Sequence, residues 1–132
     1  GLPTAIEVKS IDVIGGEHVG PILHVLRYEA RDLNKLIDAI NATGFGLTLG
    51  IHSRIENTVE YIERRAFVGN TYINRNQIGA VVNVQPFGGC GLSGTGSKAG
   101  GPHYVARLTT LTTELLAAKN HTTNTSTQTT LA

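Results

Sequence analysis

The sequence predicts an α/β fold in which a parallel β-α-β-α-β sheet is followed by a long glycine-rich loop. Two segments with helical spacing alternate with three short runs of aliphatic and β-branched residues. Seven of the sixteen glycines then gather in residues 85–102. Glycine at this density indicates backbone that turns through positive φ or passes very close to another group.

The first strand and the first helix are predicted between residues 22 and 44. The apolar run 22–28 suits a buried strand. Asp32 or Glu29 is expected to cap the helix that follows, and Gly44 stands where a left-handed C-terminal cap belongs. Four aliphatic residues recur at the spacing of one helical face: Leu33, Leu36, Ile37 and Ile40.

The unit continues with a strand over 46–51, a second helix and a third strand over 68–73. Ser53 and Glu56 have the spacing of a capping box, which predicts that the second helix begins at Ser53. Helical crossovers of about a dozen residues place the strands parallel. Two helices cannot cover both faces of such a sheet, so part of the fold is expected to lie outside this sequence.

The remaining residues are less regular. A short apolar run, 80–82, interrupts the aperiodic stretch after Asn74, and residues 103–116 could form a helix. The Thr-rich, polar segment that ends the chain predicts a disordered tail or linker. We therefore expect one folded region over 1–118 and a tail over 119–132.

Composition excludes several classes of function. The 132 residues are 40% hydrophobic and 16% charged, which is typical of a globular domain. A net charge of +1 gives no reason to expect nucleic acid or an anionic membrane as partner. A single cysteine excludes an internal disulfide, and no apolar run is long enough for a membrane span. These features predict a cytoplasmic protein, and Gly1 in place of Met suggests a fragment.

Familiar nucleotide and metal motifs do not fit. Gly89, Gly91 and Gly94 match G-x-G-x-x-G, but the glycines that follow would make a poor first turn of the helix that a dinucleotide fold requires. The order Gly-Ser-Lys98 exchanges the lysine and hydroxyl of a P-loop. The five histidines have neither a paired spacing nor an acidic companion, so no metal is expected.

Cys90 allows two interpretations. Glycine amides around a lone thiol could lower its pKa and activate it. No His or Asp lies at a spacing that specifies a base, so an inert, structural thiol is favoured.

Longer motifs resemble a known family. Glu17-x-x-Gly20-Pro21, Gly69-Asn70-Thr-Tyr-Ile-Asn74 and Gln85-Pro86-Phe87-Gly88-Gly89 occur in the order seen near the C-terminus of the aldehyde dehydrogenase superfamily. The string from Asn74 to Val82, running into 85–102, most closely resembles the L-glutamate γ-semialdehyde (pyrroline-5-carboxylate) dehydrogenase domain of bifunctional proline utilization A proteins. The resemblance covers about residues 2–108 and implies a partial aldehyde-dehydrogenase-like catalytic domain.

The resemblance implies NAD-dependent oxidation of an aldehyde that carries an α-carboxylate. A cysteine thiolate attacks the carbonyl, the thiohemiacetal gives a hydride to NAD, and a glutamate-activated water hydrolyses the thioester. FAD would belong to a proline dehydrogenase region outside this chain. The nucleophile's Gly-Gln-x-Cys context is absent here, so these residues alone are expected to be inactive.

Site roles follow by resemblance. Glu17 would accept hydrogen bonds from the nicotinamide ribose, and the amides of Gly79 and Ala80 would bind the substrate carboxylate. Phe87 would line the aldehyde's aliphatic stem. Without the resemblance, Glu17 would be a solvated charge at a strand edge and Phe87 ordinary core. Val19 is also assigned to the cofactor site, although the family usually has an aromatic residue there.

Two alternatives remain open. One is a non-catalytic aldehyde-dehydrogenase-like module that serves assembly, which Val19 and His18 favour; the other is a thiol-redox domain built on Cys90. Cys90 stands where the family often carries glutamate, so it is not expected to be the family's nucleophile. The family bridges subunits with a strand near its end, and residues 108–115 could supply one in a homo-oligomer.

Overall fold

The computed structural model describes residues 1–78 and 80–108. These residues form two compact units, Gly1–Thr43 and a second that begins at Gly44. The first unit contains β1 (Thr4–Glu7), the 3-10 helix η1 (Asp12–Ile14), β2 (Ile22–Val25), the 3-10 helix η2 (Ala30–Asp32) and α1 (Leu33–Ala42). The second contains β3 (Phe45–Gly46), β4 (Thr48–Ile51), α2 (Glu56–Arg65), β5 (Asn70–Ile73), β6 (Cys90–Gly91) and α3 (Tyr104–Leu108).

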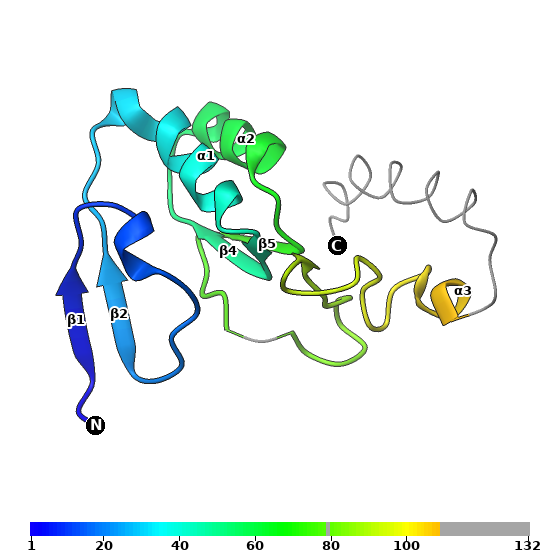
Figure 1. Ribbon diagram of the computed structural model, residues 1–132. Coiled ribbons are helices and arrows are strands. Elements are labelled where there is room, and N and C mark those ends of the chain that lie inside the picture. Colours follow the sequence, from blue (N-terminus) through cyan, green and yellow to red (C-terminus); the bar gives the residue numbers. More distant parts are fainter. Residues whose placement is uncertain (79, 109–132) are drawn as a thin grey trace. The chain divides into compact units, whose positions relative to one another are not determined.

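In the first unit, β1 and β2 form a parallel pair, with Thr4 opposite Ile22 and Glu7 opposite Val25. Residues 8–21, including η1, make the crossover between the two strands (Figure 1). An ion pair joins residues near the carboxyl ends of the two strands: the Arg27 guanidinium lies 3.0 Å from the Glu7 carboxylate. Both side chains are largely exposed, so this ion pair contributes little to stability.

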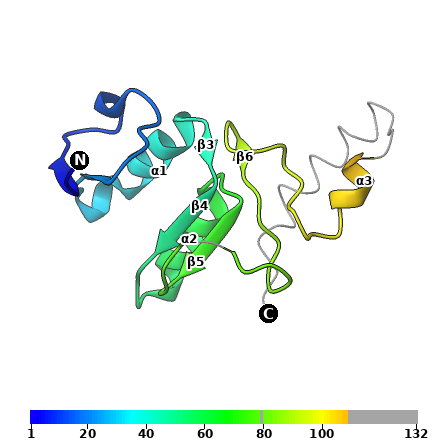
Figure 2. The same cartoon turned by 90° about the horizontal axis from the view of Figure 1, so that it is seen from below.

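In the second unit, β4 and β5 form another parallel pair, with Thr48 opposite Asn70 and Ile51 opposite Ile73. The helix α2 connects these strands and lies against one face of the pair in both views (Figures 1 and 2). Three side chains of this β-α-β unit are buried: Ile51, Val59 and Tyr72. A separate antiparallel pair joins β3 to β6, so the glycine-rich segment returns to the start of the unit.

The prediction of one three-stranded parallel sheet is wrong for the described residues. The parallel direction is confirmed for both observed pairs, but β2 pairs with β1 and β4 pairs with β5. The strand at residues 4–7 supplies β2 with a partner that the predicted sheet did not include. The apolar run 80–82 is not a strand either, because the Val81 carbonyl accepts a turn hydrogen bond from the amide of Val84 at 3.0 Å.

Helix positions are mostly confirmed, whereas their caps differ. Gly44 has φ +77°, as a left-handed position after α1 requires. Asp32 occupies the N-cap of α1 without a side-chain cap bond, because its carboxylate binds Lys35 Nζ at 3.0 Å. The capping box is wrong, since Ser53 Oγ accepts from the Ile55 amide at 3.1 Å and α2 begins at Glu56. The part of the expected helix after residue 108, and the proposed tail, lie outside the described residues.

Candidate functional site

The loop between η1 and β2, residues 15–21, carries the predicted cofactor residues. Gly15 ends η1 in a left-handed conformation, with φ +70°. The side chain of Glu17 is exposed, and among the described residues it forms no hydrogen bond or ion pair. A carboxylate in this state keeps all its acceptor sites available, so the residue fits a ligand that offers hydroxyl donors.

Val19 lies two residues further along the same loop and is 94% exposed. Its exposure makes it available to a ligand, but a valine offers no ring to stack on one. Between the two residues, His18 Nε2 lies 2.6 Å from the Ile14 carbonyl oxygen, and the His18 ring approaches the His24 ring at 6.0 Å between centroids. The loop is therefore bonded to η1 at its centre.

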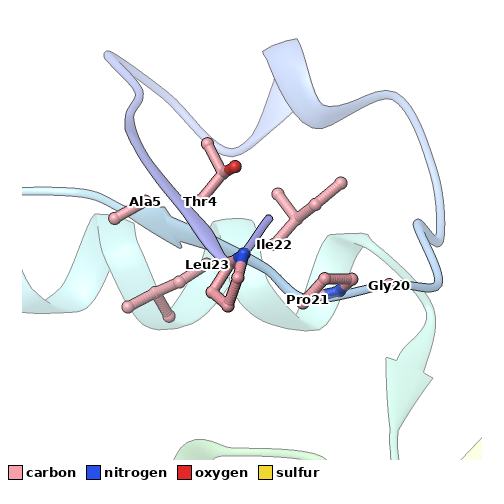
Figure 3. Close-up of a pocket in the computed structure, with 7 residues that line it drawn as sticks. Thr4, Ala5, Gly20, Pro21, Ile22 and Leu23 are labelled. Atoms are coloured by element: carbon pink, nitrogen blue, oxygen red, sulfur yellow. The ribbon is translucent and has the colours of Figure 1, made fainter. Parts of the chain in front are cut away.

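A concavity of about 430 Å³ adjoins the end of this loop (Figure 3). It is lined by Pro3, Thr4, Ala5, Gly20, Pro21, Ile22 and Leu23. These residues include no charged side chain, and the Thr4 hydroxyl already donates to the Leu2 carbonyl at 2.9 Å. Binding sites combine apolar lining with convergent polar groups, so the loop, rather than this concavity, is the candidate cofactor site.

The predicted substrate residues belong to the second unit, in the segment between β5 and β6. Gly79 lies outside the described residues. Ala80 is half-buried and lies outside every strand that the structure describes. The role of these two residues as a receptor for a carboxylate stays a prediction.

Phe87 is half-buried and fixed on both sides of its backbone. Its amide and carbonyl form an antiparallel bridge with Ala99, at 3.1 and 2.8 Å. Asn70 on β5 holds the two neighbouring residues, since Nδ2 donates to the Pro86 carbonyl at 3.0 Å and Oδ1 accepts from the Gly88 amide at 3.3 Å. The aromatic side chain thus belongs to a segment, residues 85–89, whose backbone is hydrogen-bonded on either side of Phe87. We call this segment the strap.

A second bond from β5 secures the beginning of this strap. Gln85 Nε2 donates to the Tyr72 hydroxyl at 2.8 Å. Sequence reasoning assigned no role to Asn70 or Tyr72, although both lie in the motif Gly69–Asn74. A polar residue at the start of a strand, directly after a glycine, was the available signal.

Gly69 permits the close approach between β5 and the strap. A Cβ at this position would overlap the carbonyl oxygen of Gly88 and lie 2.8 Å from the Cα of Gly89. Any other residue would push the strap away from the strand. Backbone packed on backbone explains why glycine recurs here without forming a nucleotide loop.

Cys90 lies in β6 with its thiol among backbone carbonyls. Sγ is 3.3 Å from the Phe67 oxygen and 3.6 Å from the Gly46 oxygen, which suits a neutral donor rather than a thiolate. Burial raises the pKa of the Cys90 thiol, and a backbone hydrogen bond and the Lys98 ammonium offset this only in part. An unactivated thiol supports the inert interpretation and argues against a redox role.

The described residues offer neither a metal site nor a membrane-spanning helix. Across residues 1–78 and 80–108, no three His, Cys, Asp or Glu side chains gather where a metal ion could be held. Within the same described part of the chain, no helix has the length and apolar character needed to cross a bilayer.

The fold and these motifs agree with a family comparison. A model of the aldehyde dehydrogenase family matches residues 3–113, so the chain belongs to the aldehyde dehydrogenase family. The bifunctional protein PutA of Klebsiella aerogenes is 58% identical over 106 residues, which are 80% of this chain and 8% of that protein. The bifunctional protein PutA of Rhizobium meliloti is 56% identical over 108 residues, 82% of this chain and 9% of that protein.

Solved structures give the same result. A crystal structure of Bradyrhizobium japonicum proline utilization A (PutA) superposes with a TM-score of 0.78 at 57% identity, covering 82% of this chain and 11% of that one. A 1-pyrroline-5-carboxylate dehydrogenase from Thermus, solved with bound NAD, has a TM-score of 0.69 at 40% identity, covering 79% and 20%. The chain thus spans less than a tenth of the two PutA proteins from Klebsiella and Rhizobium.

Proposed function

We propose that these residues form part of the catalytic domain of an NAD-dependent L-glutamate γ-semialdehyde dehydrogenase, which oxidises the aldehyde to glutamate in proline catabolism. The identity of 56–58% to bifunctional PutA proteins, over at least 80% of this chain, carries the proposal. The proposed protein is longer than these residues, cytoplasmic and bifunctional, with FAD bound by a separate proline dehydrogenase region. A homo-oligomer is part of the same proposal.

Two side chains of this chain have defined tasks in that reaction. Bound NAD supplies the hydride acceptor. Glu17 accepts hydrogen bonds from the ribose hydroxyls, for which its exposed carboxylate has all acceptor sites available. Charge-assisted bonds of this kind contribute about 1.5–3 kcal/mol each. Phe87, held by the strap, packs against the aliphatic stem of the aldehyde, while the amides of Gly79 and Ala80 bind its carboxylate.

The nucleophile is proposed to come from another part of the protein. Cys90 is the only cysteine in this sequence, and its thiol faces two carbonyl oxygens with a raised pKa. Such a thiol is a poor nucleophile at neutral pH. These residues alone are therefore expected to oxidise no aldehyde.

The full-length protein that contains these residues provides the test. NAD reduction should be faster with L-glutamate γ-semialdehyde than with butanal, which has the aldehyde but no α-carboxylate. Glu17→Gln should raise the KM for NAD, because the neutral amide loses charge-assisted bonding. Equal kcat/KM for the two aldehydes would contradict the substrate assignment, and an unchanged KM for NAD would contradict the role of Glu17.

A second candidate is a non-catalytic module of the same family that serves assembly. The exposed aliphatic Val19 favours it, because the family usually has an aromatic residue at this position. Calorimetric titration of the full-length protein with NAD and with a proline analogue distinguishes the two. Absence of binding at both sites would favour the structural role, and binding of both ligands would favour the enzyme.

A further inference from the structure

We propose that His18 is a positioning residue for Glu17, which holds the cofactor loop in the shape that presents the Glu17 carboxylate to the NAD ribose. This inference rests on the proposed function. It concerns a residue whose type the motif Glu17-x-x-Gly20-Pro21 leaves open and which the predicted site does not include.

A hydrogen bond joins the His18 side chain to the backbone of Ile14. Nε2 lies 2.6 Å from the Ile14 carbonyl oxygen. A carbonyl oxygen has no proton to donate, so the Nε2 atom must carry one. The bond closes the chain over four residues, and Glu17 lies inside this closed segment, directly before the histidine.

Two further features restrict the loop of residues 15–21 at its two ends. Gly15, with φ +70°, turns the chain out of η1, and the Ile22 amide donates to the Gly20 carbonyl at 2.8 Å where β2 begins. The His18 ring also lies 6.0 Å from the His24 ring on β2, tilted by 50°. His18 thus contacts the elements on both sides of the loop, η1 and β2.

Fixing this loop before the cofactor arrives has a thermodynamic consequence. An exposed loop with three glycines loses conformational entropy when a ligand orders it. A tether that restricts the loop in the free protein removes part of this cost from binding. The Glu17 carboxylate itself has no partner among the described residues, so His18 acts on it through the backbone.

The test measures the dissociation constant of NAD by calorimetric titration of the full-length protein. His18→Asn keeps an amide donor but is too short to place it where Nε2 lies, and should weaken NAD binding about three- to tenfold. His18→Gln can place its amide nitrogen near that position and should stay within about twofold of the wild type. His52→Asn, an equivalent change at an exposed histidine after β4, is the control and should have no effect.

Steady-state kinetics separate positioning from general damage. His18→Asn should raise the KM for NAD while the KM for the aldehyde and kcat stay unchanged. In a Glu17→Gln background, adding His18→Asn should have little further effect, because the loop no longer presents a carboxylate.

Three outcomes would overturn the inference: equal NAD binding by wild type and His18→Asn, equal losses in the Asn and Gln variants, or full additivity with Glu17→Gln. If Glu17→Gln leaves NAD binding unchanged, the proposed role of Glu17 fails first and this inference fails with it. If Glu17→Gln weakens binding and His18→Asn does not, only the inference fails.

Discussion

Asn74 and Ser53 are joined by two reciprocal hydrogen bonds. The Asn74 side chain accepts from the Ser53 amide and donates to the Ser53 carbonyl, each at 3.0 Å. Asn74 has φ +54°, a left-handed conformation that asparagine tolerates better than most residues. One side chain thereby ends β5, turns the chain toward residues 75–85 and ties it to the segment after β4.

Asn74→Asp should loosen this junction. The carboxylate cannot donate, and it would face the Ser53 carbonyl, so local opening should become easier by about 0.5–1.5 kcal/mol. Hydrogen exchange at the amides of residues 53 and 74 measures this change. Asn83→Asp is the matched control, because Asn83 is also left-handed, with φ +66°, and exposed, but its side chain forms no hydrogen bond with the described residues. Equal protection in both variants would contradict the prediction.

Asn70→Ala should impair aldehyde binding by releasing the strap around Phe87. Loss of the bonds to Pro86 and Gly88 is expected to lower kcat/KM for the aldehyde about five- to fiftyfold, with the KM for NAD unchanged. Asn57→Ala, on the exposed surface of α2, provides the comparison in the full-length protein. A rise in the KM for NAD alone would show that Asn70 acts elsewhere.

Gly69→Ala should be far more damaging than Gly96→Ala. The added methyl at position 69 would overlap the Gly88 carbonyl, so a loss of more than about 3 kcal/mol, or failure to fold, is expected. Gly96 has φ +89° but open space around it, and its substitution should cost about 1 kcal/mol. Thermal unfolding of the two full-length variants tests this prediction. A larger loss of stability in Gly96→Ala than in Gly69→Ala would contradict it.

Cys90 should react slowly with iodoacetamide. Since burial raises its pKa above the ordinary value of 9.0, little thiolate is present at pH 7, and alkylation should be slower than that of free cysteine. Lys98→Met should slow it further, because the ammonium favours the thiolate. Mass spectrometry of the peptide that contains Cys90 follows the reaction, and alkylation faster than free cysteine would restore the redox interpretation.

The raised pKa of Cys90 also makes the stability of the fold depend on pH. The folded state favours the neutral Cys90 thiol, and this preference stabilises the fold. The stabilisation is complete below the unfolded-state pKa, near 9.0, and is lost as the pH rises through the higher folded value. Cys90→Ala should therefore lose less stability than the wild type between pH 8 and pH 10 (about one unit on either side of that value). Denaturant unfolding at several pH values measures the difference, and parallel pH profiles would contradict it.

The sequence by itself determined the local elements and the family. The spacing of Leu33, Leu36, Ile37 and Ile40 is a property of neighbouring residues, and α1 forms where it predicts. The left-handed conformation of Gly44 could also be predicted from the sequence, because it depends on the backbone of that residue alone. The motifs around Glu17 and Phe87 sufficed to predict the aldehyde dehydrogenase family.

Only the tertiary structure decided which segments meet. The β3–β6 pair joins residues more than forty positions apart, as in Gly46 and Cys90, and no periodicity encodes that choice. Ser53 appeared to be a cap from its spacing, but its hydroxyl accepts from the Ile55 amide, and Asn74, twenty-one residues away, binds its backbone. Hydrogen bonds across such separations depend on how the chain packs in three dimensions, whereas helix spacing and glycine turns depend on the next few residues alone.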